Sequence, residues 1–121
     1  MSLDAAARRR YVRQLLLGEI GEAGQKRLLD ARFRRGDGSD ANAFAVAADY
    51  LERAGSKLAT DGEPVSIPDE EAVRRFAGAD AFVAPAAAIV GAFAAVEQIK
   101  ATLGCGEAQE FPSDLRLTGE P

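Results

Sequence analysis

The 121-residue chain contains no histidine and no tryptophan, and it has only one cysteine. Without histidine, it lacks the usual general base, the commonest zinc ligand and any Ser/His or Cys/His catalytic pair. The single Cys105 excludes an internal disulfide and a cysteine-only metal site, which suits a reducing cytoplasm. We therefore expect a cytoplasmic protein with no metal site, no cofactor and no catalytic residue.

The charges are divided unevenly along the chain, although the net charge is only −4. Residues 1–35 hold nine Lys and Arg against four Asp and Glu, whereas residues 36–121 hold six against fifteen. Opposite charges of this kind attract each other within one chain or between two copies, and the acidic balance disfavours binding to DNA or RNA. The charge pattern therefore predicts no nucleic-acid partner.

Long apolar runs are scarce, and the longest comprises sixteen consecutive uncharged residues, 81–96. This run is short for a membrane span, is mostly alanine and includes Pro85 and Gly91. It also continues through Glu97 and Lys100, so we expect a buried central helix and no membrane partner. Residues 1–17 carry charges throughout, which argues against a signal peptide.

Apolar spacing and capping residues predict about five helices. The predicted helices cover residues 5–17, 22–33, 41–54, a segment that starts near Ser66 to Asp69 and ends at 77, and the apolar run from 81 onward. Residues 34–42 read as a loop, and 56–66 as an irregular loop or a tiny hairpin. The expected fold class is all-α, a compact bundle with a central Ala-rich helix and little or no sheet. We expect residues 1–104 to form a single helical domain and residues 105–121 an extended or partly disordered tail, with possible anchors at Phe111, Leu115 and Leu117.

Two segments carry a family resemblance, RYVRQLLLGEIGEAGQKRLLDARF at 10–33 and FVAPAAAIVGAFAAVEQIKATLG at 82–104. The first is similar to the RY-x-RQ and G-x-x-GQ-x-x-L segment that leads into the nucleotide-binding domain of the ThiF/MoeB/HesA family. The second resembles the AP-x-x-x-x-VG-x-x-x-A-x-E-x-IK pattern of a late helix in the same enzymes. Together the segments cover about 47 of the 121 residues, in the family's order. The resemblance implies a relative of the ubiquitin-activating-like enzymes that adenylate the C-terminus of sulfur-carrier proteins.

The chain departs from the family between these segments, where a full-length member would be roughly twice as long. The family's glycine loop appears as GDGSDA at 36–41, with Ala41 in the third glycine position, and the first strand, which should be hydrophobic, is replaced by Phe33-Arg34-Arg35. We interpret this loop as a solvated connection that caps the following helix. The family's ATP and magnesium ligands, its catalytic cysteine and its paired CxxC zinc site have no counterparts. The resemblance is thus to an internally shortened member.

Three sets of residues are candidates for a role. Arg10 and Arg13 are the two arginines of RY-x-RQ, and the second reaches the partner subunit's ATP phosphates in the family, so the resemblance implies weak nucleotide binding in trans. The alternative is that Arg8, Arg9, Arg10 and Arg13 form a solvated face or pair with the acidic half of the chain. Cys105 is either an ordinary exposed thiol or a sulfur-accepting nucleophile. A small-residue stripe recurs every four residues and forms a core contact, a dimer interface or both, at Ala87, Gly91 and Ala95.

Three functions remain open. The leading hypothesis is a non-catalytic, homodimeric interaction module that is accessory to sulfur-carrier activation. The second is a regulatory partner that docks on a full-length ThiF/MoeB-type enzyme or its ubiquitin-like sulfur carrier and supplies Arg13 in trans. The third is an ATP-dependent adenylyltransferase, which would require ATP to bind at GDGSDA.

Overall fold

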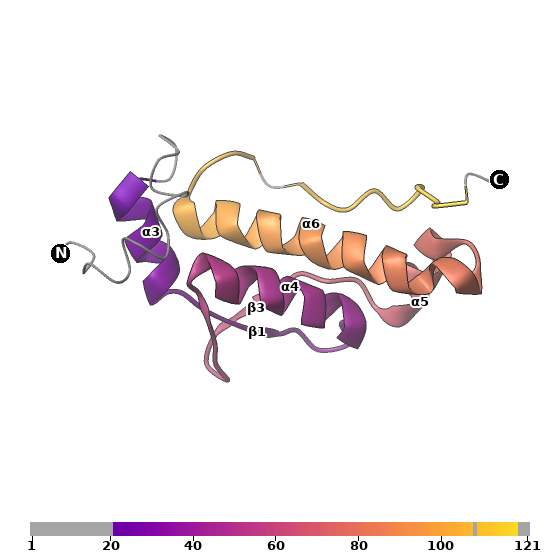
Figure 1. Ribbon diagram of the computed structural model, residues 1–121, viewed down its shortest axis with the longest axis horizontal. Coiled ribbons are helices and arrows are strands. Elements are labelled where there is room, and N and C mark those ends of the chain that lie inside the picture. Colours follow the sequence, from indigo (N-terminus) through magenta and orange to yellow (C-terminus); the bar gives the residue numbers. More distant parts are fainter. Residues whose placement is uncertain (1–20, 108, 119–121) are drawn as a thin grey trace.

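The computed structural model describes residues 21–107 and 109–118, and its elements alternate between helices and short strands (Figure 1). The order is α3 (Gly21–Asp30), β1 (Arg32–Arg35), α4 (Ala41–Ala54), β2 (Lys57–Leu58), β3 (Glu63–Val65), α5 (Glu70–Ala77), a 3₁₀ turn η1 (Asp80–Phe82) and α6 (Val83–Leu103). The helix predicted at 5–17, which contains the RY-x-RQ motif, lies outside the described residues.

The three strands form a parallel sheet in the order β2-β1-β3, so the all-α prediction is wrong and the fold is mixed α/β. Phe33 is paired with Leu58 on one side and with Glu63 on the other. Segments 57–58 and 63–65 therefore flank β1 at opposite edges instead of pairing as a hairpin. The chain from β1 through α4 to β2 is a βαβ unit.

The sheet escaped prediction because its strands are two to four residues long and expose most of their side chains. In β1 only Phe33 is buried, while the flanking arginines reach solvent, so no alternating apolar pattern is long enough to recognise. Phe33 was assigned to the preceding helix, but α3 ends at Asp30 and Phe33 lies in the strand.

Helix α4 has the predicted bounds, and its ends have the local signals that predicted them. The Asp40 side chain accepts a hydrogen bond from the Ala43 N–H, and Gly55 ends the helix in the left-handed conformation at φ 115°. Helix α5 is confirmed with its predicted end at Ala77, but it begins at Glu70 with Asp69 as its N-cap, so the cap expected at Ser66 is wrong. Helix α3 is held at the C-terminal end of α4 by a 2.7 Å hydrogen bond from Gln25 Nε2 to the Ala54 carbonyl.

Helices α4 and α6 lie side by side and run in the same direction, as Figure 1 shows. Gly91 makes this contact possible, because a Cβ there would lie 2.4 Å from the Ala43 carbonyl oxygen and 2.8 Å from Val46 Cβ. One apolar cluster joins β1, β3, α4 and α6, and a second joins the start of α4 to α5 and α6. Helix α6 thus contributes to both halves of the core.

The tail runs along α6, and its described residues have no helix or strand (Figure 1). The Phe111 ring lies edge-on to Phe76 and Phe93, with centroid distances of 4.8 and 5.4 Å. The Leu117 N–H donates to the Phe76 carbonyl at 2.8 Å. Leu115, by contrast, is exposed. Two of the three expected anchors therefore attach the tail to α5 and α6.

Within the described residues, one helical stretch, Asp80–Leu103, is long and apolar enough to cross a membrane by length and composition. Core helices of soluble proteins also meet these criteria. In this stretch the buried residues of α6 pack against α4 and α5, in the interior of a small domain whose charged side chains are largely exposed.

Candidate functional site

The GDGSDA loop lies between β1 and α4, at the carboxyl ends of β1 and β3. The expectation that no strand precedes this loop is therefore wrong, and the local order is strand, glycine loop, helix. Gly38 has φ 78°, a conformation that favours glycine. A Cβ at Gly36 would lie 3.4 Å from the Val65 carbonyl oxygen, so the loop passes close to β3. Parallel α/β sheets bind their ligands at this edge.

The N-terminus of α4, where a nucleotide phosphate would be expected, is occupied by a carboxylate of the chain itself. Asp40 Oδ2 accepts from the Ala43 N–H at 2.8 Å, and the Asp40 side chain is buried. A phosphate binds a helix N-terminus through the same backbone N–H groups and the same positive end of the helix dipole. The buried negative charge of Asp40 therefore competes with an anionic ligand for these groups.

The crevice between the loops that follow β1 and β3 is closed by backbone hydrogen bonds. The Asp40 N–H donates to the Pro68 carbonyl at 2.8 Å, which joins the two loops directly. Within the loop, the Ser39 N–H donates to the Gly36 carbonyl at 3.2 Å, and Arg35 Nε donates to the Ser39 carbonyl at 3.1 Å. Ser39 itself is buried. Two backbone N–H groups that could hold a phosphate are thus already used.

A cavity of about 610 Å³ opens elsewhere, between α6, the segment after β3 and the tail. Its lining is mainly apolar and includes Ile67, Phe93 and Phe111, and its charged groups are Glu97 and Glu110. Lys100 Nζ donates to Glu97 Oε1 at 2.9 Å and the Gln109 N–H donates to Oε2 at 3.1 Å. The Lys100 hydrogen bond is the main cause of the lowered pKa of Glu97. This carboxylate is therefore ionised and already paired, which does not suit a general base.

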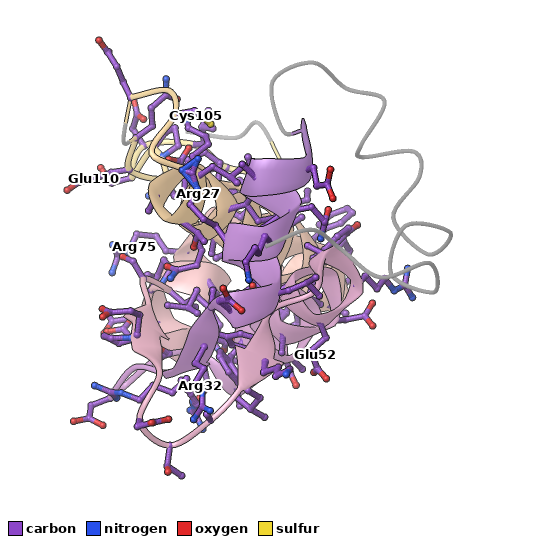
Figure 2. All side chains as sticks on the ribbon, turned by 90° about the vertical axis from the view of Figure 1, so that its left-hand side faces the viewer. Arg27, Arg32, Glu52, Arg75, Cys105 and Glu110 are labelled. Carbon is purple, nitrogen blue, oxygen red and sulfur yellow. The ribbon has the colours of Figure 1, made fainter. Side chains whose placement is uncertain are left out.

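The described part of the chain contains no group of three or more His, Cys, Asp or Glu side chains placed to hold a metal ion. Cys105 is exposed beyond the end of α6, where its N–H donates to the Lys100 carbonyl, and it lies at the α3 end of the molecule in Figure 2. Among the described residues, no acid, base and nucleophile come together around it. Arg10 and Arg13 lie outside the described residues.

The small-residue stripe of α6 faces the inside of the chain. Ala87, Gly91 and Ala95 are all buried, and Gly91 lies directly against α4. The structure therefore places the stripe in a core contact within one chain. A dimer interface on α6 would need a different side of the helix.

Such a side exists, and sequence reasoning missed it. We call it the outer face of α6, and it includes Phe82 at the end of the preceding η1 turn. Three of its side chains are large and well exposed, Phe82 at 43%, Ile89 at 44% and Val96 at 54%. Pro85 is also exposed, and Ala92 is half-buried. The signal was the seven-residue spacing of Phe82, Ile89 and Val96 within the uncharged run, which places them along one line of the helix.

The comparisons with known proteins add no family assignment. No protein-family model matches this chain, and neither a curated protein nor a solved structure does.

Proposed function

We propose that the protein is a non-catalytic relative of the ThiF/MoeB/HesA enzymes that acts as a homodimeric interaction module. The observation that carries this proposal is the Asp40 carboxylate at the N-terminus of α4, 2.8 Å from the Ala43 nitrogen. The Asp40 carboxylate occupies the helix N-terminus at which an adenylating enzyme with this loop would bind a phosphate group of ATP.

The order of strand, glycine loop and helix supports descent from a nucleotide-binding domain. The loop GDGSDA follows β1, the middle strand of a parallel sheet, as the glycine loop of a dinucleotide-binding domain follows its first strand. Within the described residues the sheet has three strands, and the loops at its carboxyl edge are joined by the hydrogen bond from the Asp40 N–H to the Pro68 carbonyl. In our proposal the domain has kept this framework and lost the ligand.

An interaction role in the cytoplasm agrees with the remaining features. The paired Glu97 and the exposed Cys105 assemble no catalytic group within the described residues, whereas α6 presents an apolar face to solvent. Proteins use apolar patches of this kind to bind other proteins. We propose that the module is accessory to sulfur-carrier activation, and that its partners are a second copy and a ThiF/MoeB-type enzyme or its ubiquitin-like sulfur carrier.

The test is a calorimetric titration of ATP and of pyrophosphate into the unmodified protein and into Asp40→Ser. Serine keeps a side-chain acceptor for the helix cap and removes the charge. The proposal predicts no saturable heat for the unmodified protein at millimolar ligand. Saturable binding at micromolar ATP would overturn it and restore the adenylyltransferase hypothesis. Capture of a full-length ThiF/MoeB-type enzyme, lost in Arg13→Ala, would instead favour the regulatory role of that arginine.

A further inference from the structure

We infer that the cavity between α6, the segment after β3 and the tail binds a small uncharged molecule with an elongated apolar body and one hydrogen-bonding group. This inference goes beyond the proposed interaction module. It depends on neither the homodimer nor the absence of ATP binding, so its failure would leave both of those proposals unchanged.

The cavity is too large to be a packing defect and has the size of a ligand site. Its volume is about 610 Å³, whereas protein interiors have few voids larger than a water molecule. Pockets for small molecules measure about 300 to 1,000 Å³. The α6 residues in the lining run from Val90 to Ala101, which is about 16 Å of the helix at 1.5 Å per residue. The ligand that fits this wall is therefore elongated.

Apolar side chains from three segments line the end of the cavity near Val90. Phe93 belongs to α6, Ile67 and Pro68 follow β3, and Phe111 comes from the tail. The Phe111 ring lies edge-on to Phe93 at a centroid distance of 5.4 Å, so the tail forms one wall of the cavity. An apolar body that enters this end loses contact with water, which favours binding.

The charged groups of the lining favour a ligand without charge. Glu97 accepts hydrogen bonds from Lys100 Nζ at 2.9 Å and from the Gln109 N–H at 3.1 Å, so its charge is already compensated. An anionic ligand would lie close to the carboxylates of Glu97 and Glu110 with no unpaired cation in the described lining. A cationic ligand would have only Glu110 to pair with, and this side chain is exposed, where ion pairs are weak.

Two polar side chains of the lining have no hydrogen-bond partner among the described residues. They are the amide of Gln98 on α6 and the hydroxyl of Ser66 after β3. Gln98 is half-buried, and its amide can both donate and accept a hydrogen bond. Ligand sites commonly combine an apolar lining with a few polar groups that fix the orientation of the ligand. A single amide, hydroxyl or secondary amine on the ligand would pair with Gln98.

Two fluorescent probes that differ by one charge test this inference on the full chain. Phenylnaphthylamine is uncharged, carries one N–H group and fluoresces in apolar surroundings. Anilinonaphthalenesulfonate has the same rings and an added anionic sulfonate. We expect phenylnaphthylamine to bind saturably, with one site per chain, and about tenfold or more tightly than the sulfonate, because the sulfonate would enter beside carboxylates.

Variants of the lining locate the probe. Ala101→Phe narrows the cavity from an exposed position and should weaken phenylnaphthylamine binding by about tenfold or more. Gln98→Leu keeps a side chain of similar size without the amide, so binding should weaken by about twofold to tenfold. Ala45→Phe, at an exposed position of α4, is the matched control and should bind as the unmodified chain does. Thermal melting followed by circular dichroism verifies that each variant is folded.

The tail supplies a second readout that does not depend on fluorescence. Because Phe111 contributes to the wall of the cavity, saturating phenylnaphthylamine should slow proteolytic cleavage of the tail in the unmodified chain. Cleavage at an unchanged rate would contradict the inference.

Three results with the probes would overturn the inference. The first is the absence of saturable phenylnaphthylamine binding. The second is equal affinity for both probes, which would indicate unspecific adsorption to apolar surface. The third is binding that persists in Ala101→Phe and is lost in Ile89→Asn, which would place the probe on the outer face of α6.

Discussion

The close contact between α4 and α6 at Gly91 leads to a sharp prediction for Gly91→Ala. In most helices this change is favourable, because alanine has the higher helix propensity by about 1 kcal/mol. At position 91, however, the added Cβ would lie 2.4 Å from the Ala43 carbonyl oxygen and 3.1 Å from the Ala47 nitrogen. Both atoms belong to the backbone of α4, so no side-chain rotation can relieve the overlap.

The two effects have opposite signs, and we expect the overlap to dominate. Inserting a methyl group into a well-packed core costs about 1 to 3 kcal/mol, and the upper part of this range applies where helices must separate. Subtracting the propensity gain of about 1 kcal/mol leaves a net loss of about 1 to 2 kcal/mol in the free energy of unfolding. For a domain of this size, the melting temperature should fall by about 4 °C per kcal/mol.

Urea unfolding followed by circular dichroism at one protein concentration measures this loss. Ala88→Gly, at an exposed position of the same helix, is the matched control, since it changes helix propensity alone by about 1 kcal/mol. If Gly91→Ala proved as stable as the unmodified protein, or more stable, the close packing of α4 on α6 would be refuted.

Three further predictions concern the loop, the tail and pH. Asp40→Ala should lower the free energy of unfolding by about 0.5 to 2 kcal/mol through loss of the α4 cap, with Asp40→Ser nearly unchanged in urea unfolding. Phe111→Ala removes ring contacts with Phe76 and Phe93, so limited proteolysis should cleave the tail faster than in the unmodified chain. The pKa of Glu97 in the folded chain lies below its ordinary value of 4.5, mainly because Lys100 donates a hydrogen bond to it. Glu97 therefore contributes to the free energy of unfolding above pH 4.5, and this contribution is lost as the pH falls through the lowered pKa. The stability difference between the unmodified chain and Glu97→Gln should follow this course in unfolding curves measured at several pH values, whereas a Glu97→Gln difference that is constant with pH would contradict it.

The sequence was sufficient where structure depends on neighbouring residues. Helix α4 was predicted with the observed bounds because Asp40, Gly55 and its apolar spacing all lie within the helix and its caps. The sheet was not predicted, because β1 gains its partners from segments more than twenty residues away and buries only Phe33. Short strands without an apolar pattern are defined by tertiary pairing instead of local propensity.

The same distinction applies to the candidate site. The glycine loop was recognisable from GDGSDA, and Asp40 was a foreseeable cap because it directly precedes α4. The hydrogen bond from Asp40 to the Pro68 carbonyl, which closes the crevice, joins residues that are far apart in the chain. The exposure of the outer face of α6 could not be predicted from the sequence alone, because it depends on α4 packing against the side of α6 that carries the small residues.

We propose that this fold keeps the framework of a nucleotide-binding domain without its ligand. This proposal is tested most directly by titrating ATP into the unmodified protein in a calorimeter, on a sample whose mass has been measured by light scattering. We expect a dimer that gives no saturable heat with ATP. Saturable micromolar binding of ATP would contradict it, and would show that the Asp40 carboxylate does not keep phosphate from the N-terminus of α4.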